Sequence, residues 1–214
     1  MCAPRSKFLS CLGDLNLPSL EDDPNAVFAL NADLSLAYVN PAWFRFAQEN
    51  GGEPAISERF AIGTPVEAGI HGPLKPYYLA RFQAALHSGV PWRQTYECSS
   101  ADTFRMYHQT VYPLRNEGGL VIVNSLAVQE PMAAQARRGM EPDRRKYETP
   151  DGLIIQCSHC RCVQRVRQPW FWDWVPSWVA RMPDGVSHAL CDACHDRYYG
   201  RDPARAPSLA ALSD

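Results

Sequence analysis

The sequence lacks the features that mark a membrane protein, a secreted protein or a general polyanion binder. No stretch of its 214 residues approaches the roughly 20 consecutive apolar residues of a membrane span. The first 13 residues hold no apolar run long enough for the core of a signal peptide. The formal net charge is only −2, which gives no reason to expect a polyanionic partner for the chain as a whole. We therefore expect a soluble, cytoplasmic protein with no membrane association.

Catalytic motifs are missing as well. The sequence shows no glycine-rich loop that would cradle a phosphate, no phospho-acceptor region of a kinase, and no nucleophile–base pair inside a known motif. It also shows no internal repeat. These absences predict a protein that is not an enzyme.

Hydrophobic residues make up 46% of the sequence, which is enough to build a core. Residues 1–136 carry 9 Lys/Arg against 13 Asp/Glu, net −4, whereas residues 137–214 carry 12 against 10, net +2. Composition shifts along the chain predict five regions: a lead-in over 1–20 that can hold a short helix, a folded domain over 21–129, a polar and basic linker over 130–149, a cysteine-rich module over 150–200 and a flexible tail over 201–214.

The first domain shows a readable order of elements. Two apolar runs, Val27–Leu30 and Leu36–Val39, flank a turn-like Asn-Ala-Asp and predict a hairpin. Asn40 stands where a helix N-cap belongs and Pro41 at the first helical position, so a helix should continue to Glu49.

Apolar residues then recur every four positions from Leu74 to Leu86 and predict an amphipathic helix between Pro73 and Gly89. Three further strands are expected over 92–98, 104–112 and 120–123. This order favours an α+β fold in which one five-stranded antiparallel sheet curls around helices on one face and leaves a pocket.

Two stretches of this domain resemble a known family. Residues 36–43, Leu-Ala-Tyr-Val-Asn-Pro-Ala-Trp, look like the strand and first helix of the PAS domain, and residues 89–98, 104–105 and 112–114 are similar to its last three strands. The resemblance covers about residues 20–128. It implies a sensory module of bacterial signalling proteins, one that binds a small molecule, haem or flavin, or that binds nothing and forms a homodimer.

Candidate ligand contacts in such a pocket are mostly aromatic, and plain core packing is the alternative for each of them. They are Tyr78, Phe82, Trp92, Tyr96, Phe104 and His71, with Tyr77 and Tyr107 beside them. The candidate haem ligands are three histidines, for which an exposed or hydrogen-bonded side chain is the alternative: His71, His87 and His108. Cys98 reads as a small core residue.

Five of the 8 cysteines lie within one short C-terminal stretch, and four of them form two Cys-x-x-Cys pairs, Cys157/Cys160 and Cys191/Cys194. Two residues between cysteines let a tight turn aim both thiolates at one point, and two such turns supply the four soft ligands of a zinc ion. Disulfides are rare in a reducing cytoplasm. The pairs therefore predict one structural zinc in a zinc-ribbon-like module, with an iron–sulfur centre or redox-active dithiols as alternatives.

The 30 residues between the two pairs leave room for a helix, and Trp170, Trp174 and Trp178 are spaced by four, so we expect a tryptophan-rich helix over the metal. A module of this size buries little surface alone, and a metal staple is physically expected. Side chains that could compete as ligands are Cys162, His159, His195 and His188.

This module is similar to one appended to bacterial PAS proteins, histidine kinases and cyclic-dinucleotide enzymes. The likeness rests on the paired cysteines, Trp172, Val175, the run Val-Ser-His-Ala-Leu-Cys over 186–191, and Tyr198. If His188 is not a ligand itself, we expect it to donate a hydrogen bond to the sulfur of a cysteine ligand. Cys162 and Gln164 depart from the pattern, because that module usually has basic residues there.

Together these features predict a non-enzymatic sensor or adaptor, whose zinc module contacts a signalling partner protein. Two alternatives stay open: a haem or redox sensor, and a nucleic-acid-binding regulator. The second would use arginines that otherwise form a solvated rim, namely Arg161, Arg165, Arg167, Arg181, Arg197 and Arg201. The net +2 of the second half and the four thiolates weigh against nucleic acid.

Overall fold

The N-terminal hairpin and helix form where the sequence predicts them. In the computed structural model the described residues are 12, 16–115 and 118–200. Strands β1 (Ala26–Leu30) and β2 (Leu36–Val39) pair antiparallel. Helix α3 (Pro41–Glu49) follows, and the Asn40 side chain caps it by accepting a hydrogen bond from the Trp43 backbone N–H at 3.0 Å.

Two short helical segments and one long helix come before the last three strands: α4 (Ala55–Arg59), the 3₁₀ turn η1 (Val66–Gly69) and α5 (Leu74–Ser88). Helix α5 ends at Gly89, whose φ of +67° is the left-handed conformation that glycine adopts without a steric penalty. The predicted helix limits are confirmed here.

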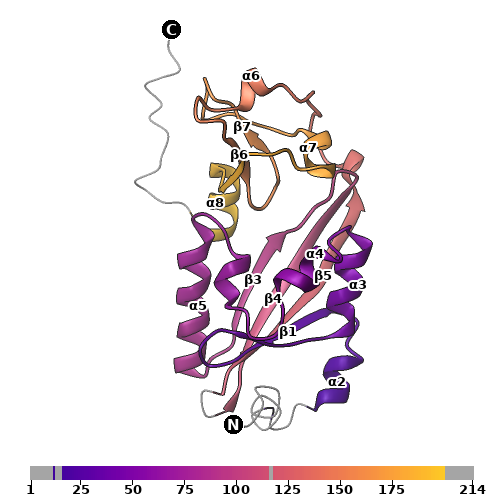
Figure 1. Ribbon diagram of the computed structural model, residues 1–214, viewed down its shortest axis with the longest axis vertical. Coiled ribbons are helices and arrows are strands. Elements are labelled where there is room, and N and C mark those ends of the chain that lie inside the picture. The colour runs from indigo at the N-terminus through magenta and orange to yellow at the C-terminus, as the bar shows by residue number, and fades with distance from the viewer. Residues whose placement is uncertain (1–11, 13–15, 116–117, 201–214) are drawn as a thin grey trace. The chain divides into compact units, whose positions relative to one another are not determined.

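The remaining strands of the first unit are β3 (Trp92–Glu97), β4 (Thr103–Pro113) and β5 (Leu120–Pro131). All pairings are antiparallel and the strand order is β2-β1-β5-β4-β3, which confirms the predicted α+β fold with a five-stranded antiparallel sheet (Figure 1). Strand β5 runs well past the predicted 120–123, because its later residues still pair with β4 although most of their side chains are exposed. The polar residues Asn124 and Ser125 end the apolar run, so the sequence gives no continuous signal for the strand residues beyond them.

The sheet is covered on both faces around β1, whereas the prediction placed helices on one face only; on β4, His108 and Tyr112 are exposed. On one face Leu30 and Ile122 pack against Phe82 of α5. On the other, Val27 packs with Leu20 of α2 (Leu17–Glu21), a short helix within the predicted lead-in. The continuous apolar run in β1 is typical of a strand covered on both sides.

Residues 137–214 form a second compact unit, separate from residues 1–136. Its strands are β6 (Ile154–Cys157), β7 (Val163–Gln164), β8 (Trp172–Asp173) and β9 (Val186–Ala189), in the order β8-β7-β6-β9. Its helices are α6 (Arg144–Tyr147), α7 (Pro176–Ala180) and α8 (Asp192–Tyr199). The predicted tail over 201–214 lies outside the described residues.

The tryptophans between the cysteine pairs do not lie on one helix, which corrects the sequence expectation. Trp170 is 65% exposed in a loop, whereas Trp174 and Trp178 are buried. Pro176 has no backbone N–H and stands at the start of α7, so the helix cannot extend back through it. Upstream, the chain pairs with β7 as a strand instead.

Part of the stretch predicted as a linker belongs to the core of this second unit. Tyr147 at the end of α6 is fully buried and packs with Ile154, Val163, Val175 and Trp178. The turn η3 (Met132–Ala134) follows β5 directly.

In the described part of the chain, no helix is both long enough and apolar enough to cross a membrane.

Candidate functional site

Parallel pairing of β6 with β9 brings the two cysteine pairs to the same edge of the small sheet. Residue Cys157 ends β6 and pairs with Ala189, the last residue of β9. Two residues later the chain reaches Cys191. Because parallel strands end at the same edge, segments more than thirty positions apart in sequence present their first cysteines side by side.

Each pair lies on its own tight structure. In the first, the Cys157 backbone N–H donates to the carbonyl of Cys162 at 2.8 Å, and Arg161 adopts a left-handed φ of +62°. In the second, Cys191 is the N-cap of α8 and its carbonyl accepts the His195 N–H at 2.8 Å. Both geometries fold two thiols inward over three residues, as the spacing predicts.

The four thiols fit one tetrahedral ion. All four Sγ atoms lie within 4.8 Å of one another, and every one of the four residues is buried. Cys160 Sγ and Cys191 Sγ are 3.7 Å apart. A tetrahedron with metal–sulfur bonds of about 2.3 Å has edges of about 3.8 Å. Four soft donors around one point fill a tetrahedral coordination shell, so the group suits a structural metal ion. The Cys162 thiol lies outside the group and bonds to the Cys160 thiol.

Without a cation the thiols must share protons unequally. Hydrogen bonds from Cys157 and its neighbours hold the pKa of the Cys160 thiol far below its usual range. Hydrogen bonding with Cys157 raises the pKa of Cys191 and of Cys194 far above theirs. The hydrogen bond with Cys160 opposes ionisation of Cys157, but bonds with Cys191 and Cys194 outweigh it, so the pKa of Cys157 is lowered as well. Several thiolates this close together repel each other. A divalent cation removes that repulsion and releases the protons.

The competing ligands lie outside this group, in the part of the chain that the structure describes. His159 is 3% exposed, and its Nε2 lies 2.8 Å from the hydroxyl of Tyr199. His188 pairs with Gln156 in the parallel ladder, one position before Ala189. Side chains alternate along a strand, so His188 lies on the face opposite Cys157, and its predicted support of a cysteine ligand stays a prediction.

A row of polar side chains crosses the inner face of the five-stranded sheet. Gln94 on β3 donates to Gln109 on β4 at 3.2 Å, and Gln109 donates to Asn124 on β5 at 3.0 Å. The hydroxyl of Tyr96 also reaches Asn124 at 3.1 Å, and Tyr78 of α5 bonds Gln94. Burial and nearby Cys98 raise the pKa of Tyr96 well above its usual value, so it stays a neutral donor. Burying amides removes polar groups from water, and only the hydrogen bonds between them offset that cost. The same amides could offer donors and acceptors to a ligand.

The predicted pocket residues divide into two groups. Tyr78, Phe82 and Trp92 meet in one aromatic cluster, with ring centroids 5.8–6.1 Å apart. Tyr96 stacks on Tyr107 at 5.6 Å. Phe104 is buried on β4, three positions before Tyr107, and the register of β4 with β5 shifts between Met106 and Tyr107.

The three candidate haem ligands are all exposed. His71 lies before α5, and the His87 ring bonds the carbonyl of Gln83. His108 bonds Thr95 at 3.0 Å. A haem ligand would have to lie among buried side chains, so the structure gives none of the three the surroundings that this prediction needs.

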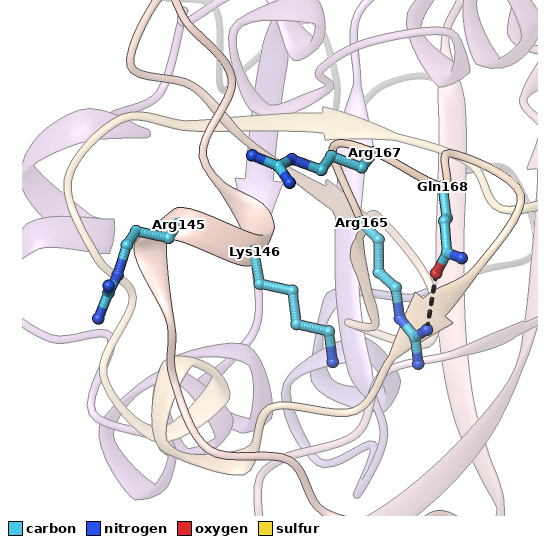
Figure 2. Close-up of a pocket in the computed structure, with 5 residues that line it drawn as sticks. All are labelled: Arg145, Lys146, Arg165, Arg167 and Gln168. Atoms are coloured by element: carbon cyan, nitrogen blue, oxygen red, sulfur yellow. Dashed lines mark hydrogen bonds between the residues drawn. The ribbon is translucent and has the colours of Figure 1, made fainter.

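A basic cavity opens on the second unit, with a volume of about 360 Å³. It is lined by Arg145, Lys146, Arg165, Arg167 and Gln168. Figure 2 shows the Lys146 and Arg165 side chains extending in the same direction, with Arg145 and Arg167 extending in other directions.

Asp173 fixes these two cations. Its carboxylate accepts from Arg165 at 2.7 and 2.8 Å and lies 2.8 Å from Lys146 Nζ. The Tyr147 hydroxyl donates to the same carboxylate at 2.8 Å. The bonds from Arg165, more than any other cause, hold the pKa of Asp173 far below its usual range.

Sequence reasoning missed most of this second site. It considered Arg165 and Arg167 only as members of a rim, and Arg161, Arg181 and Arg197 of the same set do not line the cavity. Arg201 lies outside the described residues. Only the turn that brings α6 beside residues 165–168 groups Lys146 with Arg165. No spacing in the sequence signals that contact.

No family model matches the chain, and no curated protein matches it. Matches among solved structures include a domain of an HTR-like protein from Haloarcula marismortui, with 18% identity, 50% of this chain and 100% of that chain covered, and a TM-score of 0.35. A domain of a sensory box sensor histidine kinase/response regulator from Geobacter sulfurreducens has 16% identity, coverage of 50% and 88%, and a TM-score of 0.36. The PAS domain of a protein from Colwellia psychrerythraea has 14% identity, coverage of 51% and 92%, and a TM-score of 0.36. At such scores these neighbours carry no argument about activity.

Proposed function

We propose that this chain is a non-enzymatic signalling sensor or adaptor, in which the first unit senses a small molecule or forms a homodimer and a zinc-stapled second unit contacts a partner protein. The observation that carries the proposal is the buried, closed group of four cysteines. A metal with four thiolate ligands has no open position for substrate, so its role is to hold the second unit in shape.

The second unit needs such a staple. Its described buried cluster contains only Tyr147, Ile154, Val163, Val175 and Trp178 around two very short strands and a longer pair. A core of this size supplies few kcal/mol against the entropy of ordering the chain. Binding of a structural zinc contributes about 10 kcal/mol or more in small domains.

The surface of the second unit supports a contact with another protein. Trp170 is 65% exposed and Phe171 48% exposed, next to each other on the loop that connects β7 with β8. Large aromatic side chains with arginine nearby are the residue types that anchor protein interfaces. Exposure of both rings is costly in water and supports an interface there.

The polar row on the inner face of the first unit supports a small-molecule ligand. Gln94, Gln109 and Asn124 could exchange their mutual hydrogen bonds for bonds to a ligand, and the rings of Tyr78 and Trp92 lie beside them. Such a combination of apolar walls and a few convergent polar groups is typical of ligand pockets.

Native mass spectrometry of the purified full chain tests both halves of the proposal. We expect a mass increment of one zinc per chain, confirmed by elemental analysis. We also expect either a bound small molecule that dissociates on denaturation or a dimer. The variant Gln109→Leu should lose the small molecule, whereas Thr110→Val, its neighbour on the other face, should keep it. A chain that folds fully without metal, or visible absorption from haem, flavin or an iron–sulfur centre, would contradict the proposal.

A further inference from the structure

We propose that the basic cavity of the second unit, formed by Lys146, Arg165, Arg167 and Gln168, binds a phosphoryl group. This deepens the proposed docking role by naming the chemistry that the surface recognises. The phosphoryl site follows from the residues of the cavity; that the phosphoryl group belongs to a partner protein rests on the proposed function.

The charges in the cavity are not balanced. Arg145, Lys146, Arg165 and Arg167 bring four positive charges. Asp173 supplies one negative charge that Lys146 and Arg165 share, and Asp143 supplies another, 3.9 Å from Arg145. Two positive charges therefore remain. A phosphate monoester carries −1.5 to −2 at neutral pH and offers three strong acceptor oxygens. A single carboxylate would compensate only half of the excess.

The two cations are held in place before any ligand arrives. Asp173 accepts both N–H groups of one edge of the Arg165 fork, and the Arg165 guanidinium lies over the Phe171 ring at 4.9 Å. The Val166 backbone N–H donates to the Lys146 carbonyl at 3.0 Å and ties α6 to the segment after β7. Fixed donors lose little entropy on binding, which favours affinity for a compact anion.

Donors remain for a ligand. Lys146 has three N–H groups, and Asp173 accepts only one of them at 2.8 Å. Among the described residues, the Arg167 side chain makes no hydrogen bond or ion pair, and it lies exposed at the cavity. Gln168 uses its carbonyl oxygen to accept from Arg165 at 3.1 Å, and its amide N–H groups stay available. Charge-assisted donors of this kind are the usual partners of phosphate.

The size of the site favours one phosphoryl group over a nucleic-acid strand. A volume of about 360 Å³ stands at the small end of ligand pockets. A strand needs a track of cations along several phosphates. Among the described arginines of this unit, only Arg145 lines the cavity beside Arg165 and Arg167, and Figure 2 shows it pointing away from Lys146 and Arg165. The lining therefore suits a single anionic group better than a row of phosphates.

The test is a titration of the full, metal-containing chain with inorganic phosphate, followed by backbone amide chemical shifts. We expect saturable shifts confined to residues 144–147 and 165–168. Arg167→Gln should weaken binding about tenfold, as expected for one charge-assisted hydrogen bond. Because Arg167 is exposed, the variant should fold as the parent does, and its unperturbed spectrum without phosphate checks this.

Arg181→Gln is the matched control, since it removes an exposed arginine of the same unit that lies outside the cavity. Equal weakening in both variants, or shifts spread over all arginines, would overturn the site. So would a failure of phosphate to bind while an oligothymidine strand binds in a salt-dependent way.

Two further probes identify the source of the phosphoryl group. A phosphoserine peptide that binds more tightly than phosphate, through added shifts at Trp170 and Phe171, would place the group on a protein partner. Tighter binding of a mononucleotide would place it on a small molecule, and would support the site while contradicting the docking role in the proposed function. If phosphate does not bind while the chain still holds its zinc and its first-unit ligand, this inference is wrong and the proposed function stands.

Discussion

Asn40 is a fully buried amide that joins three segments of the first unit. Its side-chain oxygen accepts from the backbone N–H groups of Val27 and Trp43 at 2.9 and 3.0 Å. Its amide nitrogen donates to the carbonyls of Leu20 and Asn25 at 3.1 and 2.9 Å. The residue is therefore an N-cap and also the link that ties the chain before β1 to the start of α3.

We expect Asn40→Ala to lower the free energy of unfolding of the first unit by about 3 kcal/mol, because several buried backbone groups lose their partners together. Urea unfolding followed by hydrogen exchange in residues 26–40 measures this. Asn50→Ala is the control: Asn50 is exposed, its side chain bonds only the Phe46 carbonyl at 2.8 Å, and its loss should cost less than about 1 kcal/mol. Equal effects would show that Asn40 acts as an ordinary cap.

The Asp173 carboxylate should make the stability of the second unit depend on pH. Its side chain is only 11% exposed and is bonded by Arg165, Lys146 and Tyr147. Since its pKa is lowered in the folded chain, its stabilisation is present above the unfolded value of about 3.9 and is lost as pH falls through the lower folded value.

Asp173→Asn should therefore lower the free energy of unfolding by about 2 kcal/mol at pH 7, and the gap to the parent should narrow only below about pH 4. Thermal unfolding over a pH series measures this. Asp184→Asn, at an exposed carboxylate, should change the free energy by less than about 0.5 kcal/mol at every pH. A gap that stays constant down to pH 2 would exclude the ionised carboxylate as the cause.

At the scale of elements, the pairing of β1 with β5 depends on a glycine. Gly119 has a φ of +141°, and a Cβ there would lie 2.1 Å from the carbonyl oxygen of Leu30. Leu30 pairs with Leu120, the first residue of β5. Both the backbone conformation and the close approach therefore require glycine.

Gly119→Ala should lower the free energy of unfolding of the first unit by more than about 2 kcal/mol and loosen the end of this strand pair. Gly51→Ala is matched to it, because Gly51 also has a positive φ, +69°, but a Cβ there would meet nothing within 4 Å. We expect about 1 kcal/mol for that change. Hydrogen exchange of the β1 and β5 amides compares the two variants.

Elements with a strong local signal were predictable, and elements made by long-range pairing were not. The limits of α5 follow from Pro73, Gly89 and a four-residue apolar spacing. In contrast, the segment around Trp172 shows helical spacing of tryptophans but forms a strand, because pairing with β7 and the position of Pro176 outweigh that spacing. Propensity is a weak prior when tertiary contacts compete with it.

At the scale of the whole molecule, the two compact units should respond differently to loss of metal. On the proposed function, Cys157→Ser or a strong chelator should remove one zinc per chain and unfold residues 137–200, while residues 16–115 keep their protection from hydrogen exchange. The first unit has two buried core clusters of its own, and the four cysteines lie outside it.

Cys162→Ser is the control for this experiment. Cys162 follows the first pair by two residues but does not belong to the group of four thiols. We expect the variant to keep its zinc and its second-unit fold. Loss of zinc in both variants, measured by elemental analysis, would mean that the ligand set differs from the four cysteines.

The sequence by itself determined the α+β class, the first hairpin, the capped helices α3 and α5, and the four cysteines that meet at one point. These follow from signals within a few residues: caps, periodicity and the two-residue spacing of thiols. Only the tertiary structure decided that Tyr96 stacks on Tyr107, that β6 and β9 bring the two cysteine pairs to one edge, and that Asp173 bonds both Lys146 and Arg165 beside one cavity. Strand register and the meeting of distant segments depend on the sum of many weak contacts, and no short stretch of sequence records that sum.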